Sequence, residues 1–162
     1  MSERFHVRVT KDYLVFSAAH FITFAGNVCE RLHGHNYRIA CEAHGPLDEN
    51  QYVVDFVALR DMLRELSLEL DHHMLLPTAH PTIRVNAGER EVEVNFEDRR
   101  WVFPKRDCVL LPVANTTAEL LAKYLAGRLL TAFDDRRMAR PDRLRIEVDE
   151  CEGQIGVYEW TA

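Results

Sequence analysis

The chain of 162 residues is 47% hydrophobic and 28% charged, so it can bury one ordinary core without disulfides or a partner. A formal net charge of -6 argues against a protein that coats a phosphate backbone over its whole surface. The charged start lacks the apolar core of a signal peptide, and no apolar run reaches the roughly 20 residues of a membrane span. We therefore expect one domain over residues 1–162, located in the cytoplasm, with neither a membrane nor a nucleic acid among its partners.

The four cysteines form no CxxC pair and no dense disulfide framework. Free thiols in a reducing cytoplasm are therefore expected, which leaves a cysteine available as a chemical reagent. The four are Cys29, Cys41, Cys108 and Cys151.

Apolar and polar residues alternate loosely over residues 5–19 and more regularly over residues 36–44, which predicts two strands. After Asp55, a predicted N-cap, apolar residues recur every three or four positions up to Leu70. This spacing predicts an amphipathic helix that ends near Leu70.

A second helix is predicted from Thr116 to about Asp134, because Thr116 and Glu119 have capping-box spacing before a run of apolar residues. Between the helices, residues of about 78–112 contain three β-prone runs, which predict a small antiparallel meander added as a flap. The final runs LRIEVDE and QIGVYEW alternate around a glycine-bearing turn and predict a hairpin. Two helices on one face of an antiparallel sheet, with a β insert between the helices, make an α+β fold.

His33 and His35 lie two residues apart in CERLHGHNY, so their side chains share one face if they begin the following strand. His20 ends the stretch FSAAH and reaches the same point if the two strands pair. Three neutral imidazoles leave one tetrahedral position open, which is the pattern of a catalytic zinc site. Any one of these histidines alone is as readily an ordinary strand-end residue, so only the combination predicts a site.

Cys29 lies four residues before His33, where a thiolate near a divalent metal would act as a base or nucleophile. Asp71 and His72 follow the first helix and can move protons together only if the chain turns there; otherwise they decorate a helix C-terminus. Glu150 enters the last turn, where its carboxylate either grips a guanidine-like ring through two hydrogen bonds or is simply solvated. Three further histidines have no partner in the sequence and are expected to be surface or satisfied core residues: His6, His44 and His80.

The motifs FSAAH, CxxxHGHNY, LDHHML, NTTAELLAKYL and VDECEGQIGVY together resemble the 6-pyruvoyltetrahydropterin synthase and 6-carboxytetrahydropterin synthase family. The resemblance covers most of the chain outside residues of about 78–112. It implies a tunnelling fold (T-fold), in which each subunit contributes a four-stranded antiparallel sheet with two helices on one face. It also implies that three subunits close a barrel and that two trimers form a homohexamer with active sites between subunits.

The resemblance also implies one Zn2+ ion per subunit and three groups of site residues. These are the zinc ligands His20, His33 and His35, the base Cys29 with the proton-relay pair Asp71 and His72, and the substrate-binding residues Glu150, Thr116 and Thr117.

The implied substrate is 7,8-dihydroneopterin triphosphate, a small reduced pterin. The CxxxHGH spacing favours the branch that forms 6-carboxy-5,6,7,8-tetrahydropterin for queuosine and 7-deazaguanine biosynthesis, with triphosphate elimination to 6-pyruvoyltetrahydropterin as the alternative. Glu30, three residues before HGH, resembles the folate-pathway branch that forms 6-hydroxymethyl-dihydropterin, so CERLHGH is compatible with both reactions. Cys151 departs from the pattern, because relatives often have a threonine there.

Two functions outside these branches remain open. A non-catalytic pterin-binding protein would keep zinc for structure, but it would need neither a base such as Cys29 nor a relay such as Asp71 and His72. A general metal-dependent hydrolase would use zinc to activate water. It predicts turnover of simple esters or phosphates that survives the substitution Cys29→Ala.

Overall fold

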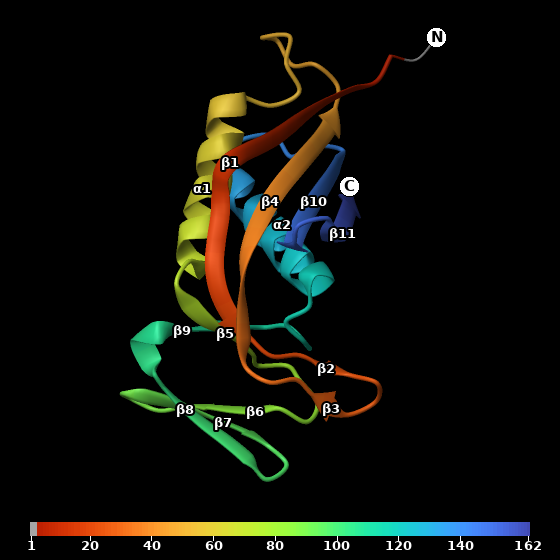
Figure 1. The fold of residues 1–162 in the computed structure, drawn as a ribbon. Helices are drawn as coiled ribbons and strands as arrows, with labels where there is room; N and C mark the ends of the chain where they lie inside the picture. The colour runs from red at the N-terminus through yellow and green to blue at the C-terminus, as the bar shows by residue number, and fades with distance from the viewer. Residues whose placement is uncertain (1–2) are drawn as a thin grey trace.

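A computed structural model describes residues 3–162, which form one large sheet, two small sheets and two α-helices (Figure 1). The large sheet has the strand order β11-β10-β4-β1-β5-β9. Its strands are β1 (Phe5–His20), β4 (His33–Gly45), β5 (His73–Pro77), β9 (Cys108–Leu111), β10 (Arg143–Cys151) and β11 (Gln154–Thr161). The small sheets contain β2 (Thr23–Phe24) with β3 (Val28–Cys29), and β6 (Arg84–Ala87) with β7 (Glu91–Phe96) and β8 (Arg99–Pro104).

The four longest strands of the large sheet are antiparallel neighbours, as predicted. β1 pairs with β4 from Phe5 opposite Gly45 to His20 opposite His33, and β10 lies between β4 and β11. β5 and β9 extend this sheet and run parallel to β1, so the sheet is mixed rather than wholly antiparallel. The short apolar runs of β5 and β9 carry no alternation, which is why sequence periodicity did not predict them.

The first helix, α1 (Phe56–Leu70), confirms both predicted ends. The Asp55 carboxylate accepts hydrogen bonds from the backbone N–H of Val57 at 2.7 Å and of Ala58 at 3.2 Å, so Asp55 is the N-cap. No helix within residues 3–162 combines the length and apolarity that a membrane crossing requires.

The second helix, α2 (Ala118–Asp135), begins two residues later than predicted. Its N-cap is Thr117, which makes no side-chain capping bond, so the predicted capping box with Glu119 is absent. The Thr116 hydroxyl instead donates to the carbonyl of Phe21 at 3.3 Å, because Thr116 is fully buried against the end of β1.

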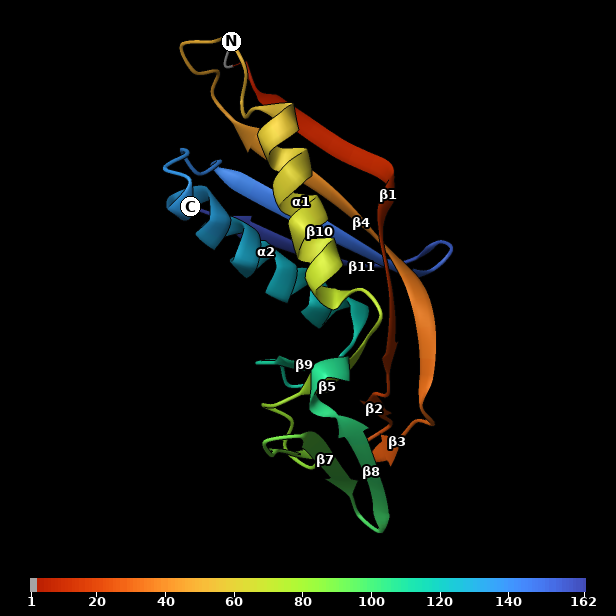
Figure 2. The ribbon, with the colours of Figure 1, turned by 90° about the vertical axis from the view of Figure 1, so that its left-hand side faces the viewer.

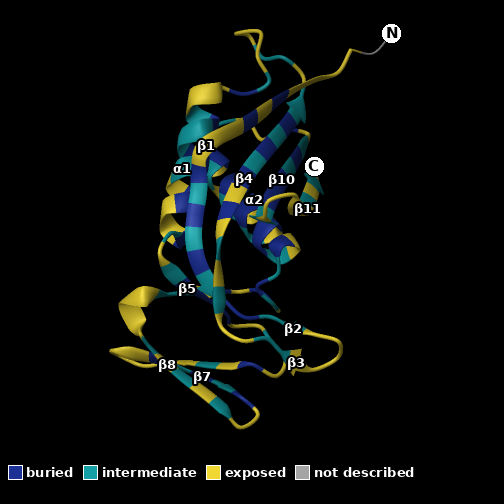
Figure 3. Cartoon of the chain, in the orientation of Figure 1, coloured by how far each residue is buried: buried dark blue, intermediate teal, exposed yellow. Residues whose placement is uncertain are grey.

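Both helices pack on one face of the large sheet (Figure 2). The predicted alternation on β4 is confirmed, because buried and less buried residues follow each other along the strand (Figure 3). The buried set on β4 is Tyr37, Ile39, Cys41 and Ala43. The start of α2 lies so close to β11 that a Cβ atom on Gly156 would be 2.5 Å from the carbonyl carbon of Ala118.

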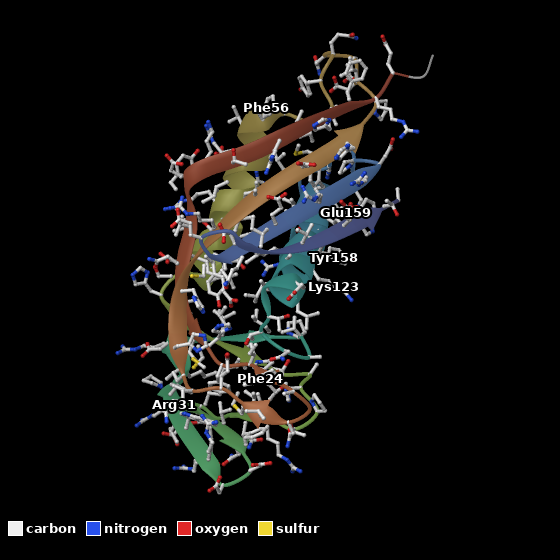
Figure 4. The ribbon with its side chains drawn as sticks, turned by 45° about the vertical axis from the view of Figure 1, so that its right-hand side comes forward. Phe24, Arg31, Phe56, Lys123, Tyr158 and Glu159 are labelled. Atoms are coloured by element: carbon white, nitrogen blue, oxygen red, sulfur yellow. The ribbon has the colours of Figure 1, made fainter. Side chains whose placement is uncertain are left out.

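The predicted insert forms an antiparallel meander of β6, β7 and β8, beyond the ends of the two helices (Figure 1). It has its own apolar cluster, which Phe21 of the β1–β2 connection joins. Figure 4 labels Phe24, at the end of β2, and Arg31, shortly after β3. This part of the chain lies beside the meander. The insert is therefore packed against the segment that links β1 to β4.

Candidate metal centre and active site

The pairing of β1 with β4 brings the three predicted histidines together. His20 lies opposite His33 and Ala18 lies opposite His35, so the three imidazoles share one face of the sheet. One ligand nitrogen from each of His20, His33 and His35 lies within 4.8 Å of the others. The three residues are thus placed to hold one metal ion.

Backbone carbonyls orient two of these rings. Nδ1 of His20 lies 2.9 Å from the carbonyl oxygen of Thr116, and Nδ1 of His33 lies 2.8 Å from that of Arg31. A carbonyl only accepts, so each Nδ1 must carry the proton and each Nε2 keeps a free lone pair. This is the arrangement that metal-binding histidines usually show.

The Nε2 atom of His20 is buried and has no hydrogen-bond partner within residues 3–162. The Glu150 carboxylate approaches it to 3.3 Å, but without the geometry of a hydrogen bond. Leaving such an atom unsatisfied costs about 1–3 kcal/mol, and a bound metal ion would remove that cost. Burial lowers the pKa of His20 to about 4, which keeps the imidazole in the neutral form that binds metals.

Two carboxylates flank the histidines. Oε1 of Glu150 lies 3.3 Å from Nε2 of His20 and 3.8 Å from Nε2 of His35. The buried Tyr37 hydroxyl donates to the same Glu150 oxygen at 3.3 Å, and burial raises the pKa of Tyr37 above its usual range. On the other side, Oε2 of Glu30 lies 3.8 Å from Nε2 of His33.

The Cys29 thiol points elsewhere. It packs against the apolar cluster of the insert and approaches the Glu30 carbonyl oxygen at 3.5 Å. Burial raises the pKa of the Cys29 thiol, and the positive charge of Arg99 opposes that rise. The structure therefore places the Glu30 carboxylate, rather than the Cys29 thiol, against the histidines.

The Asp71–His72 pair forms because the chain turns where α1 ends. His72 has a left-handed backbone with a φ of 59°, and its Nδ1 lies 2.9 Å from Oδ2 of Asp71. Burial raises the pKa of Asp71, but hydrogen bonds from the Ser17 N–H and from His72 outweigh it and lower the pKa overall.

Of this pair, His72 lies on a cavity that it shares with His35, one of the three histidines. The His72 side chain is 82% exposed, and within residues 3–162 Asp71 is its charged partner. The volume of this open cavity is about 550 Å³, and its lining also includes Ser17 and Phe103. Ser17 follows the buried Phe16 on β1, so its side chain points away from the face that carries His20.

The predicted substrate residues meet only in part. A cavity of about 400 Å³ is lined by Glu150 and Thr117, together with the first turn of α2 and Gly156. Because no side chain caps α2, backbone N–H groups at this turn are free to bind a ligand. Thr116 is buried and contacts the site through its carbonyl, which orients His20.

Sequence reasoning missed two residues of this site. The alternation over residues 36–44 places Tyr37 on one face of a strand, and nothing in that pattern indicates that its hydroxyl reaches Glu150. Arg99 lies in the insert, 70 residues from Cys29, yet it donates to that residue's carbonyl oxygen. Only the folded structure brings such distant residues together.

Comparison with known proteins agrees with this geometry. The model of the family described as 6-pyruvoyl tetrahydropterin synthase matches residues 8–160. A Methanocaldococcus jannaschii protein named putative 6-carboxy-5,6,7,8-tetrahydropterin synthase is 29% identical over 90% of this chain and 89% of its own. A Pyrococcus abyssi protein of the same name is 31% identical over 71% of this chain and 69% of its own.

Among solved structures, Plasmodium vivax 6-pyruvoyltetrahydropterin synthase has a TM-score of 0.90 and 27% identity, covering 99% of this chain and all of that one. A second structure of that protein, with the same TM-score, carries alanine in place of a glutamate described as a catalytic residue. The family match spans nearly the whole chain and includes all the site residues described above. This chain therefore belongs to the 6-pyruvoyl tetrahydropterin synthase family.

Proposed function

We propose that this chain is a cytoplasmic, zinc-dependent lyase that converts 7,8-dihydroneopterin triphosphate to 6-carboxy-5,6,7,8-tetrahydropterin, in queuosine and 7-deazaguanine biosynthesis. One observation carries the proposal: three histidines converge with a buried, unpartnered Nε2 on His20, and carboxylates approach on two sides. The names of the archaeal relatives support the 6-carboxy product.

His20, His33 and His35 would hold one zinc ion per subunit, because three neutral imidazoles are a usual ligand set for catalytic zinc. When bound, zinc polarises hydroxyl groups of the substrate side chain and makes a neighbouring carbon-bound hydrogen more acidic. The chain's own residues must then bind the pterin ring, accept that proton and return one.

Glu150 would bind the guanidine-like edge of the pterin through paired hydrogen bonds. Tyr37 supports this role by donating to one carboxylate oxygen and so fixing its direction. Thr117 and the free N–H groups at the start of α2 line the same cavity and can donate to ring or side-chain oxygens. Substrate would thus lie between Glu150 and the histidines.

The reaction needs a base on the open side of the metal centre, and the two candidates are Cys29 and Glu30. Cys29 can act only if its thiol turns away from the insert toward the histidines. Glu30 needs no such movement, because its carboxylate already lies 3.8 Å from His33.

The second candidate function follows from Glu30. With a carboxylate as base, the same centre would form 6-hydroxymethyl-dihydropterin for folate, alone or beside the 6-carboxy product. The position of the Glu30 carboxylate favours this function, as does the catalytic glutamate described for the Plasmodium vivax enzyme.

Asp71 and His72 would complete the site of a neighbouring subunit in a homohexamer built as a dimer of trimers. The 82% exposure of the His72 side chain, on an open cavity, leaves it accessible to a neighbouring subunit and supports this arrangement. Within residues 3–162, the terminal strand β11 has one neighbour, and most of β1 is unpaired on one side because β1 meets β5 only at Ala18 and Ala19. β1 and β11 run in opposite directions, so β11 of one subunit can pair antiparallel with β1 of the next.

The test is to incubate the zinc-loaded protein with 7,8-dihydroneopterin triphosphate and to identify the products by mass spectrometry. Acetaldehyde with 6-carboxytetrahydropterin supports the first function, and 6-hydroxymethyl-dihydropterin supports the second. A 6-pyruvoyl product without acetaldehyde would move the assignment to the pyruvoyl branch. Binding without turnover, in a zinc-loaded hexamer, would leave a pterin-binding protein.

A further inference from the structure

Arg99, at the start of β8 in the insert, donates hydrogen bonds to the backbone of both candidate bases, Cys29 and Glu30. Its Nη1 donates to the carbonyl oxygen of Cys29 and its Nη2 to that of Glu30, each at 2.8 Å. Within residues 3–162, Arg99 forms no ion pair with a carboxylate. Its guanidinium group is therefore committed to these two successive carbonyls.

Such a two-point contact fixes the orientation of the Cys29–Glu30 segment. A planar guanidinium fork holds both carbonyls in one geometry, which a flexible amine does not. The Glu30 N–H donates to the carbonyl of Ile22 at 2.9 Å, so the segment is held on a second side. With its backbone fixed, the segment directs the Glu30 carboxylate to His33 and the Cys29 thiol into the insert.

Arg99 is itself held in place by aromatic side chains. Its guanidinium lies 4.6 Å from the centre of the Trp101 ring, and Trp101 stacks on Phe21 at 4.7 Å. Phe21 follows His20 directly in the chain. Packing therefore connects the insert to the histidine cluster through Trp101 and Phe21.

A second contact ties the insert to the same loop. The Asn27 side chain donates to Oε1 of Glu97 at 3.1 Å, two residues before Arg99. The insert thus supports the loop before His33 rather than lying as a flap over the cavity beside Glu150, whose lining contains no insert residue among those described.

We propose that Arg99 is a positioning residue that keeps Glu30, rather than Cys29, facing the metal centre, and that the insert exists to hold it there. The proposal rests on the second candidate function, in which Glu30 acts as a base beside Cys29. This contact would then control product specificity. Release of the Cys29–Glu30 segment shifts the reaction from the product that depends on Glu30 to the product that depends on Cys29.

The test compares Arg99→Ala and Arg99→Lys with the control Arg100→Ala. Arg100 is the next residue, and it pairs with Glu93 at 2.7 Å inside the insert instead of reaching the loop. In zinc-loaded enzyme, Arg99→Ala should lower kcat for 6-hydroxymethyl-dihydropterin about tenfold or more and raise the 6-carboxy share of the products. KM should change less than kcat, Arg99→Lys should fall between, and Arg100→Ala should match the wild type.

A readout without substrate separates this proposal from the proposed function. Loss of the Arg99 charge by itself raises the pKa of the Cys29 thiol and slows its alkylation, so the rate constant of the thiolate form is taken from the pH dependence of the rate. In Arg99→Ala, that rate constant with iodoacetamide should rise at least about fivefold for Cys29, while those of Cys108 and Cys151 stay unchanged. Amide hydrogen exchange should rise in the peptide that covers residues 28–31. These changes without any turnover by the wild type would retain the positioning role and reject the function.

Three results would overturn the proposal. An unchanged product ratio together with unchanged Cys29 reactivity in Arg99→Ala would show that the segment needs no such support. Equal losses of every product in Arg99→Ala and Arg99→Lys, in parallel with lost zinc, would show a general structural role. Failure of both variants to fold would show the same.

Discussion

Oε2 of Glu30 lies 3.8 Å from Nε2 of His33, three residues further along the chain. The adjacent Cys29 faces the opposite way, into the insert, because successive residues of an extended segment point to opposite sides. Of the two candidate bases next to the histidines, this structure therefore directs Glu30, and not Cys29, toward them.

Removal of a metal ligand should weaken metal binding without unfolding the chain. His33→Ala should lower zinc affinity at least about tenfold, because two imidazoles hold the ion less well than three. His44→Ala is the matched control, since His44 lies on the same strand but outside the cluster. Metal analysis after dialysis measures the difference, and full zinc retention by His33→Ala would contradict the ligand assignment.

The Tyr37 hydroxyl should matter for substrate binding more than for chemistry. Tyr37→Phe removes one hydrogen bond to Glu150, worth about 1 kcal/mol, so KM should rise roughly fivefold while kcat and zinc content stay near the wild type. Tyr52→Phe, in a loop at the other end of β4, should leave KM unchanged. A Tyr37→Phe enzyme that loses kcat at constant KM would argue against Glu150 as the pterin anchor.

Gly156 should tolerate no side chain. A Cβ atom there would lie 2.5 Å from the backbone nitrogen of Glu119, so Gly156→Ala must push α2 away from β11 and should cost about 1–3 kcal/mol of unfolding free energy. Gly127→Ala, inside α2 and with nothing within 4 Å, should instead be neutral or stabilise by up to about 1 kcal/mol. Urea unfolding of both variants tests this, and equal effects would refute the close approach of α2.

Acid should loosen the insert through His80. Its Nδ1 accepts backbone N–H bonds from Thr82 at 3.0 Å and Ile83 at 2.8 Å, so His80 is a satisfied residue with partners that its sequence context did not reveal. Burial lowers the pKa of His80 below 6.5 in the folded protein. The unfolded chain therefore binds this proton more readily, and stability should fall as pH drops from about 6.5 toward the lowered pKa.

The matched variant is His80→Asn, which keeps an acceptor near the Nδ1 position but cannot take up a proton. Hydrogen exchange at residues 82–83, measured from pH 5 to 8, should increase toward acid in the wild type and much less in His80→Asn. Identical pH profiles for the two proteins would exclude His80 as the cause.

Regular alternation and helical spacing made the main fold predictable. The strands β1, β4, β10 and β11 bury one face each, and α1 has a strong N-cap at Asp55, so local pattern and final structure agree. β5 and β9 were missed because short apolar runs have no period. The start of α2 was misplaced because the Thr116 side chain bonds to the carbonyl of Phe21, a contact that depends on tertiary packing.

The histidine cluster was predictable because a strand pairing needs only spacing, and His20, His33 and His35 lie near the facing ends of two paired strands. The direction of Glu30 and Cys29 was not, because it depends on Arg99, which is 70 residues from Cys29. Likewise, the cavity that His35 and His72 share depends on the parallel pairing of β1 with β5, which adjacent sequence does not reveal.

If this histidine centre rearranges a pterin side chain with Cys29 and Glu30 as alternative bases, each base should control a different product. The most direct measurement is product analysis of zinc-loaded wild type, Cys29→Ala and Glu30→Gln with 7,8-dihydroneopterin triphosphate. We predict that Cys29→Ala loses 6-carboxytetrahydropterin with acetaldehyde and that Glu30→Gln loses 6-hydroxymethyl-dihydropterin, with zinc retained in both. Undiminished formation of every product in the Cys29→Ala, Glu30→Gln double variant would contradict it.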